Sequence, residues 1–529
     1  MDANDENKMN EIFSKLESNN IISYKYSINN KIYMNFELNE VEKECFSIIM
    51  NILKKNNLNS VISRVAGGWV RDKLLGKESD DIDIAVSGIN VSDLVKIINE
   101  ELYSGKSKIG IIKQNPNRGK NVEVITTKIC KISIDFVNLR TKDKDGIPSP
   151  LSDAEFRDIS INSLFYNINE QKVEDFTKRG IKDLENGIIE TPIEPNIGLK
   201  NDPFIIIRML RFAIKYKFRI EKDINDYIQK NGKDILDEFC TKVSKQRLEK
   251  EMTKIFLIDN SEFIIAYLYS FNILDILFFL KDYDLNFNYD NLFLKVTNLY
   301  ILGHYLLKRG EKIFEIELNS DNFNKIDYSF LLLTLFFRNF KYKDTYLNHK
   351  ILSTTYKTSI EHRNENNFMC KNFDELLKII NENKYERFPI FKVLKKIHIN
   401  NIIHVLLASI AYEYIESVKL DSILSEIDEG VLQKIIDKNK KFYDYVKNED
   451  LLHLDKMKPL INAKEIAELL NIKGNKEIGT IKNYLMDEQI KNPKLSKEEA
   501  IELIKKKREE LFPNSNDNCN RISGKKNEK

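Results

Sequence analysis

The feature that most constrains this chain is the stretch GGWVRDKLLGKESDDIDI, which runs from Gly67 to Ile84. It ends in two alternating aspartates, Asp81 and Asp83, at the start of a segment typical of a strand. Alternate side chains of a strand share a face, so these two carboxylates point the same way. Like charges this close disfavour ionisation unless a cation lies between them. The pattern therefore predicts a site for Mg²⁺, which prefers oxygen ligands and completes its shell with substrate phosphates.

The double glycine at the start of the stretch predicts a second function. Gly67 and Gly68 allow the backbone to approach an anion closely, and Arg71 follows one helical turn later, able to bind a phosphate. Together the two halves predict a nucleoside triphosphate site with two-metal phosphoryl-transfer chemistry. For either half alone, an ordinary glycine turn or a strand with a solvated acidic turn is the alternative.

Length and composition limit the other possibilities. A chain of 529 residues is too long for one ordinary core, which predicts two to four domains. Its 83 Lys and Arg against 81 Asp and Glu leave a formal charge of +2, so any nucleic-acid surface must come from local charge distribution. The five cysteines lack the spacing of a zinc site or a disulfide scaffold. The acidic N-terminus has no apolar signal core, and we expect a cytoplasmic protein without a membrane partner, organellar import not being excluded.

The hydrophobic pattern predicts an α+β chain with two different halves. Helical spacing over 46–58 is followed by strand-like segments in VISRVAGG, DIDIAVSG, VEVITTKI and ISIDFVNL. We expect FRDISINSLFYNI to be helical and VEDF to open a short strand. Beyond residue 195 the pattern is almost wholly helical, with Pro203 in a first helical turn, and SFLLLTLFF at 329–337 is expected as a buried helix. Ser496 and Glu499 predict a capping box at the start of a late helix.

Five ordered segments resemble a known family. GGWVRDKLLGKESDDIDIAV resembles the first signature of the class II tRNA nucleotidyltransferases, the CCA-adding enzymes and poly(A) polymerases of the DNA polymerase beta superfamily. FRDISINSLFYNINEQKVEDFTKRGIKDLENGIIETP is similar to the second and third signatures, NDPFIIIRMLRFAIKYKF to the fourth and VSKQRLEKEMTKIF to the fifth. The strands VEVITTK and SIDFVNLR also match, so the resemblance covers residues 60–255.

The resemblance implies a polymerase-beta-like head and a long all-α body. We expect an N-terminal extension at 1–45, a nucleotidyltransferase head at 46–195, base-recognition neck helices at 196–260, a tRNA-binding body and tail at 261–512 and a disordered basic tail at 513–529.

The resemblance also assigns roles to individual residues. Asp81 and Asp83 would be the catalytic, metal-binding carboxylates, with Glu123 as the first candidate for a third carboxylate and Asp135 as the second. The nucleotide-binding residues would be Gly67, Gly68, Arg71, Arg157, Asp158, Asn162, Asp202, Arg208 and Arg211. Within this set, Arg157 and Asp158 would recognise the ribose 2′-hydroxyl. Arg247 and Glu251 would organise the site, with an i,i+4 ion pair between them as the simpler interpretation.

One departure concerns base choice. In the family an aspartate and an arginine three residues later imitate Watson–Crick pairing with C or A, and here Asp202 is followed by Ile205. Asn201, Phe156 and Glu190 also depart from the pattern, and the loop within 140–156 is shorter than usual. Either Arg208 or a lysine supplies the missing hydrogen bond, or base selection has changed, or the chain is a decayed tRNA-binding paralogue.

The resemblance predicts template-independent addition of C, C and A to the 3′ end of tRNA from CTP and ATP, with Mg²⁺ in a two-metal site and release of pyrophosphate. Partial CC or A addition and poly(A)-type polymerisation are the alternatives. The tRNA acceptor and T-arm would contact basic patches at 215–223, 392–398 and 505–512, each of which has a solvated helix face as its simpler interpretation.

Overall fold

The computed structural model describes residues 26–107, 109–112, 123–130, 132–140, 148–280, 289–319, 323–356, 359–397, 399–472 and 475–511. The chain forms two compact units. The first unit comprises Met1–Leu306, Lys325–Arg363 and Val418–Ile427, and the second comprises Leu307–Asn324, Asn364–Ser417 and Asp428–Lys529.

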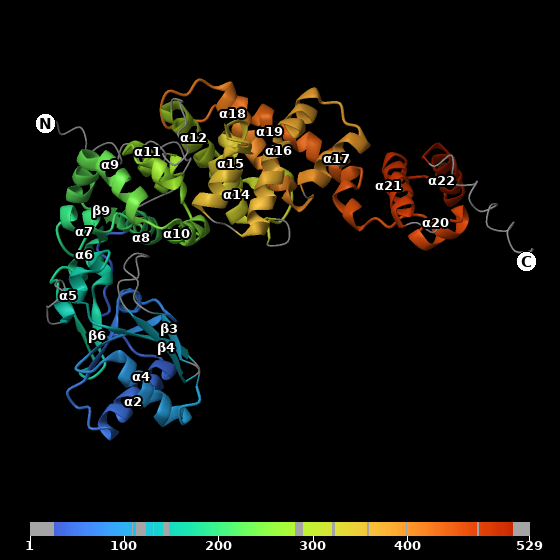
Figure 1. Ribbon diagram of the computed structural model, residues 1–529. Coiled ribbons are helices and arrows are strands. Elements are labelled where there is room, and N and C mark those ends of the chain that lie inside the picture. The colour runs from blue at the N-terminus through green and yellow to red at the C-terminus, as the bar shows by residue number, and fades with distance from the viewer. Residues whose placement is uncertain are drawn as a thin grey trace, which may run out of the picture. The chain divides into compact units, whose positions relative to one another are not determined.

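The N-terminal part of the first unit contains a mixed sheet (Figure 1). Its described strands follow the order β3-β4-β5-β2-β1-β6-β7. The strands are β1 (Ile62–Ala66), β2 (Ile82–Ser87), β3 (Gly110–Ile112), β4 (Val124–Ile129), β5 (Ile132–Asn138), β6 (Phe165–Asn167) and β7 (Lys172–Glu174). Only β2 and β5 pair in parallel within this described sheet, and the other neighbours are antiparallel. A parallel pair needs a crossover, and the intervening chain supplies one that includes α4 (Val91–Tyr103), which packs on β4 and β5.

Helix α2 (Glu40–Lys55) packs beside α4 and fixes the start of the head. It begins six residues before the expected 46 because Asn39 and Glu42 form a capping box that satisfies the first backbone N–H groups. Glu42 also accepts a hydrogen bond from the indole of Trp69 at 2.9 Å and forms an ion pair with Lys73 at 3.0 Å. This buried carboxylate therefore ties α2 to α3 (Gly68–Leu74), the helix that follows the double glycine.

The segment FRDISINSLFYNI is not the expected helix. Its backbone forms the 3₁₀ turn η2 (Ser160–Asn162) and then β6, which pairs with the edge of β1. Ile159, Ile161, Leu164 and Phe165 are all fully buried. Because they occupy both odd and even positions, the apolar pattern does not separate a helix from a buried turn and strand.

Helices dominate the rest of the first unit. They include α5 (Pro150–Glu155), α6 (Gly180–Asn186), α7 (Pro195–Asn201), α8 (Ile205–Tyr216), α9 (Lys222–Lys242), α10 (Lys245–Leu257), α11 (Glu262–Ser270), η3 (Leu274–Leu277), α12 (Tyr289–Leu307), α14 (Lys325–Thr334), η5 (Leu335–Asn339), α15 (Leu347–Lys350) and the π-helical η6 (Ile351–Thr355). Two small pairings, β8 (Ile188–Ile189) with β9 (Arg219–Ile220) and β10 (Lys341–Tyr342) with β11 (Thr345–Tyr346), complete it. Pro203 lies in the turn just before α8 rather than in its first helical turn. The apolar run at 329–337 is buried in α14 and η5, as expected.

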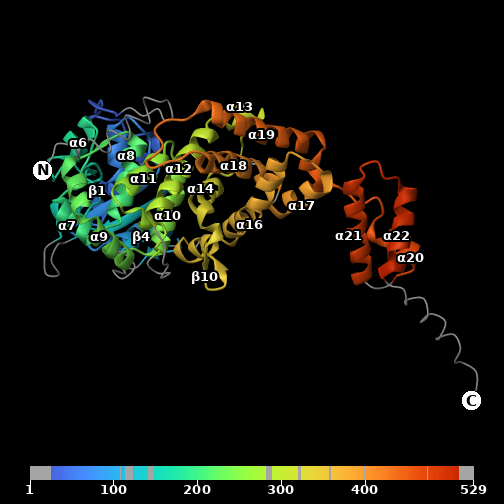
Figure 2. The same ribbon diagram turned by 90° about the horizontal axis from the view of Figure 1, so that it is seen from above.

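The second unit is helical throughout its described part. Its elements are α13 (Gly310–Phe314), most of α16 (Ile360–Glu382), α17 (Arg387–Ile397), η7 (Ile399–Asn401), α18 (Ile402–Ser417), α19 (Glu429–Asn448), η8 (Leu451–Lys456), α20 (Ala463–Leu470), α21 (Asn475–Lys491) and α22 (Lys497–Leu511). Helices α20, α21 and α22 pack together (Figure 2). Their core includes Ile466, Leu485 and Ile504. The predicted capping box is confirmed: Ser496 Oγ accepts from Glu499 N at 3.1 Å and Glu499 accepts from Ser496 N at 2.9 Å.

No single helix in the described part of the chain is long and apolar enough to cross a membrane. The bent pair of α17 and α18 passes by length and composition only.

Candidate nucleotidyl-transfer site

The double glycine forms a turn that requires glycine at its first position. Gly67 has a φ of +80°, and a Cβ there would lie 2.7 Å from Nη1 of Arg157. The N–H of Gly67 donates to the carbonyl of Leu164 at 3.0 Å. The turn therefore holds β1, α3 and the second-signature segment close together.

The paired aspartates lie where β2 begins. Asp81 is exposed immediately before the strand, and Asp83 is half-buried within it. Asp135 on β5 is the parallel register partner of Asp83, so the two side chains leave the same face of the sheet. Burial, and then the neighbouring Asp81 carboxylate, raises the pKa of Asp83 to about 6, with Asp135 adding to the rise. Negative charge is therefore crowded at this point of the sheet.

These carboxylates suit a divalent cation without forming a complete cage. Among the described residues, no group of three or more His, Cys, Asp or Glu side chains is arranged to hold a metal ion. An ion bound by Asp81 and Asp83 would need water and substrate phosphates as further ligands, which is the usual arrangement for Mg²⁺. The crowded negative charge and the all-oxygen donor set fit such an ion.

Glu123, the first candidate for the third carboxylate, lies away from this cluster. Thr126 is the β4 residue opposite Asp135, and Glu123 precedes it by three positions, or about 10 Å of strand. The carboxylate of Glu123 instead accepts a hydrogen bond from Ser92 at the start of α4, at 3.3 Å. The geometry therefore favours Asp135, the second candidate, whose carboxylate accepts from Thr126 Oγ1 at 2.6 Å.

Arg140 and Arg157 lie near Asp83, and both bind the buried carboxylate of Asp153. Nε and Nη2 of Arg157 donate to Oδ2 of Asp153 at 3.2 and 2.9 Å, and the backbone N–H of Arg140 donates to Oδ1 at 3.2 Å. Both guanidinium groups lower the pKa of Asp83, which places their positive charge near the aspartates. Arg140 was not among the predicted site residues. Its place at the end of the alternating segment ISIDFVNLR was the available signal.

Arg71 is placed differently from its prediction. Its side chain is only 5% exposed, and Nε and Nη2 donate to Asp72 at 3.0 and 2.9 Å. Nη1 donates to Oδ1 of Asn162, and the guanidinium lies 4.7 Å from the ring centre of Tyr216. This buried position argues against direct contact with a phosphate, because the guanidinium is already committed to protein partners.

Asn162 and Asp158 continue this hydrogen-bonded chain toward α8. Nδ2 of Asn162 donates to Oδ1 of Asp158 at 3.1 Å, while Nε and Nη2 of Arg208 bind Oδ2 of Asp158 at 2.8 and 2.7 Å. Although burial opposes it, the positive charge of Arg208 and these hydrogen bonds lower the pKa of Asp158 to about 2. We call the series Asp72, Arg71, Asn162, Asp158 and Arg208 the head–neck network.

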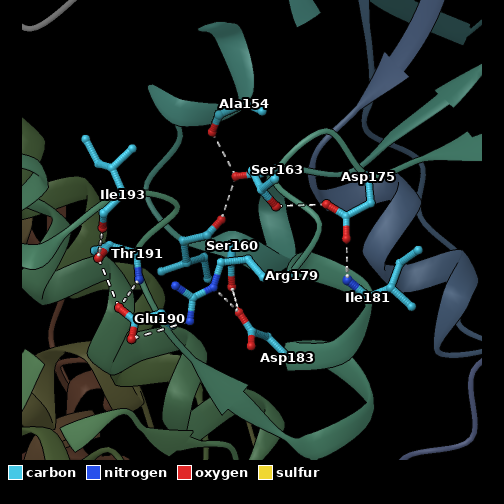
Figure 3. Close-up of polar contacts among 12 residues, drawn as sticks. Ala154, Ser160, Ser163, Asp175, Arg179, Ile181, Asp183, Glu190, Thr191 and Ile193 are labelled. Atoms are coloured by element: carbon cyan, nitrogen blue, oxygen red, sulfur yellow. Dashed lines mark hydrogen bonds and ion pairs between the residues drawn. The ribbon is translucent and has the colours of Figure 1, made fainter. Parts of the chain in front are cut away.

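A second cluster of polar side chains contacts the 3₁₀ turn at Ser160 (Figure 3). Ser160 Oγ donates to Asp183 at 2.5 Å, and Arg179 binds Asp183 at 3.0 Å and Glu190 at 3.5 Å. Glu190, which stands where the family pattern has arginine, is buried and accepts from the backbone N–H of Thr191 at 2.8 Å. The acidic residue at 190 thus has a structural partner in Arg179.

Helix α10 contributes two ion pairs, and neither is the expected pair within the helix. Glu251 pairs with Arg211 of α8, and both side chains are buried. Arg247 pairs with Asp202, with Nη2 to Oδ2 at 2.8 Å and Nη1 to Oδ1 at 3.4 Å. The i,i+4 interpretation is wrong because partners on α8 and at the end of α7 lie within reach of these side chains.

Comparison with known proteins shows two kinds of similarity, one to a family model and one to whole enzymes. Residues 63–190 match the model of the poly(A) polymerase head domain. The mitochondrial CCA tRNA nucleotidyltransferase of Candida glabrata is 28% identical over 484 residues, which cover 84% of this chain and 90% of that protein. The enzyme of the same name from Saccharomyces cerevisiae is 27% identical over 493 residues, covering 84% and 87%. The chain is similar to CCA-adding enzymes over most of its length and to the poly(A) polymerase head domain in residues 63–190.

A solved structure gives the same fold. The Thermotoga maritima CCA-adding enzyme complexed with tRNA matches with a TM-score of 0.59 at 18% identity, covering 91% of this chain and 98% of that one. Ile205, where the family arginine is expected, is 9% exposed at the first turn of α8.

Proposed function

We propose that this protein adds C, C and A to the 3′ end of tRNA from CTP and ATP, with release of pyrophosphate. The observation that carries the proposal is the alignment of 84% of the chain with relatives named CCA tRNA nucleotidyltransferase. The aspartates of β2, with the head–neck network beside them, support an active enzyme. In a protein that binds no cation, the repulsion between these carboxylates would destabilise the fold.

We assign Asp81 and Asp83 to a divalent metal, specifically Mg²⁺, and Asp135 to the third carboxylate. When bound, the metal would stabilise charge on the α-phosphate and on the leaving pyrophosphate. Asp135 lies on the face shared with Asp83, where its carboxylate can accept a hydrogen bond from the tRNA 3′-hydroxyl and orient it for in-line attack. Arg140, whose positive charge lies near Asp83, can bind the triphosphate, a role that the buried Arg71 is unsuited to.

We assign ribose recognition to Arg157 and Asp158, supported by Asn162. Asp158 remains ionised at neutral pH because Arg208 and Asn162 stabilise its charge, so it can accept a hydrogen bond from the 2′-hydroxyl. A deoxynucleotide would leave these polar groups without that partner, and the site would therefore select NTP over dNTP.

The helices beyond the head are proposed to hold the acceptor and T-arm of tRNA by shape and by phosphate contacts. We keep the division into a head at 46–195, a neck at 196–260 and a body from 261 as part of this proposal. Several lysines of the predicted basic patches already have acidic partners: Lys396 binds Glu375 at 2.8 Å and Lys507 binds Glu510 at 3.0 Å. The patches at 392–398 and 505–512 are therefore less basic than their sequences suggest. We propose a mitochondrial or cytoplasmic site of action.

The proposal is tested by supplying the purified protein with a tRNA that ends at the discriminator base. Each NTP is given separately and in combination, and the products are sequenced. We expect CCA ends with CTP plus ATP and no extension after Asp81→Ala or Asp83→Ala. Full activity of these variants would contradict the metal assignment.

Ile205 favours a second candidate function, in which addition is partial or base selection is relaxed. Products ending in CC or a lone A would establish partial addition, and long A tails would establish poly(A)-type activity.

A further inference from the structure

The Asp202 and Arg247 pair joins the end of α7 to the start of α10. Asp202 ends α7, and Arg247 occupies the first turn of α10. Their side chains are 33% and 27% exposed, whereas the Arg211 and Glu251 pair between α8 and α10 is buried. Arg208 connects this point to the proposed ribose site, because it binds Asp158 and Asp202 contributes to its electrostatic environment.

The pair is held rigidly but keeps hydrogen-bonding capacity. The guanidinium of Arg247 lies 4.3 Å from the ring centre of the buried Phe204, and Ser244 caps the backbone N–H of Arg247 at 3.3 Å. Two contacts to Asp202 use two of the five guanidinium N–H donors. In the described part of the chain, Oδ2 of Asp202 accepts one hydrogen bond, which leaves a further acceptor site.

This arrangement is complementary to one edge of two bases. Cytosine and adenine each present an amino donor beside an unprotonated ring nitrogen, whereas uracil and guanine present a carbonyl beside a ring N–H. A carboxylate next to a guanidinium accepts from the first kind of edge and donates to it. With uracil or guanine, the carboxylate would meet a carbonyl and the guanidinium would meet a ring N–H. These polar groups would be left unpaired, which gives strong discrimination against the two bases.

We propose that Asp202 and Arg247 form the base-reading pair of this protein, with Arg247 of α10 supplying the guanidinium that Ile205 of α8 cannot. The inference rests on the proposed function and names its specificity-determining residue. Arg208, the other candidate for this role, already directs Nε and Nη2 to Asp158. The partly exposed Asp202 and Arg247 pair would instead remain in place and receive the base.

The test measures kcat/KM for all four NTPs on a tRNA ending at the discriminator base and on one ending in CC. Arg247→Ala is expected to lower the values for CTP and ATP by about 10- to 100-fold, the loss of one hydrogen bond to a charged group, and to leave those for UTP and GTP unchanged or raised. Arg247→Lys should fall between the two, because it keeps the charge but not the planar fork. Lys250→Ala, an exposed lysine on the same helix, is the matched control.

A second variant separates base reading from structural support. Ile205→Arg in the Arg247→Ala background returns a guanidinium three residues after Asp202 and should restore selectivity for CTP and ATP. An equal fall for all four NTPs after Arg247→Ala, with no recovery in the double variant, would overturn the inference and leave Arg247 a structural residue.

Binding by calorimetry distinguishes this inference from the proposed function. CTP should bind the wild-type protein with Mg²⁺ more tightly than UTP, and Arg247→Ala should remove the difference. If the wild type shows this preference but extends no tRNA, the proposed function fails and the base-reading pair stands. If tRNA is extended while the preference survives Arg247→Ala, only the pair is wrong.

Discussion

Asp83 and Asp135 occupy the same register position on the parallel strands β2 and β5, and their carboxylates therefore leave one face of the sheet together. The two residues lie in different stretches of the sequence, one in β2 and the other in β5. Their meeting depends on the only parallel pairing in the described sheet, so a shift of one residue in that pairing would send Asp135 to the opposite face.

Asp135→Asn should lower nucleotide addition by at least about 100-fold, because the amide loses the charge that orients the attacking hydroxyl. Single-turnover rates on tRNA with CTP measure the effect. Glu123→Gln is the matched control, since Glu123 contacts Ser92, and it should retain wild-type rates. The reverse result would return the third carboxylate to Glu123.

Gly67→Ala should destabilise the protein and reduce activity together. The positive φ of Gly67 disfavours any Cβ, and the new methyl group would meet Nη1 of Arg157 at 2.7 Å. We expect a loss of about 1–3 kcal/mol in the free energy of unfolding by chemical denaturation. Gly479→Ala serves as comparison, because no atom lies within 4 Å of its Cβ position in α21, and it should be neutral or stabilising by up to about 1 kcal/mol.

Asp158 should make a pH-dependent contribution to stability. Its pKa falls from 3.8 to about 2 on folding, so the stabilisation is fully present above pH 3.8 and is lost as the pH falls through about 2. The shift corresponds to about 2 kcal/mol in the free energy of unfolding at neutral pH. The difference between wild type and Asp158→Asn in urea denaturation should therefore be constant from pH 7 to 5 and shrink below pH 4. The exposed Asp93→Asn should show no such trend.

A double-mutant cycle distinguishes the two possible partners of Glu251. The cycle of Arg211→Met with Glu251→Gln should give a coupling energy of about 1.5–3 kcal/mol, because the pair is buried and charged. The cycle of Arg247→Met with Glu251→Gln should give less than about 0.5 kcal/mol. Equal coupling in both cycles would restore the ion pair within α10.

Local patterns predicted the strands β2, β4 and β5, the turn at Gly67 and the capping box at Ser496, because each depends on residues adjacent in sequence. The choice of Asp135 over Glu123 depends on strand register, which no local pattern contains. An ion pair of Arg247 with Glu251 along their helix was the simpler interpretation of their spacing, but the local rule is worth only a few tenths of a kcal/mol and yields to tertiary partners. The prediction of a helix for the segment that forms η2 and β6 was wrong for a related reason. The backbone of this segment is decided by pairing with β1, which is distant in sequence.

The head–neck network has a consequence for how this protein can change over evolutionary time. Its five side chains depend on one another, so replacing any one leaves a charge or an amide without its partner. Residue 205 takes no part in that series, although it lies three positions before Arg208. A substitution at residue 205 therefore leaves every hydrogen bond of the head–neck network in place.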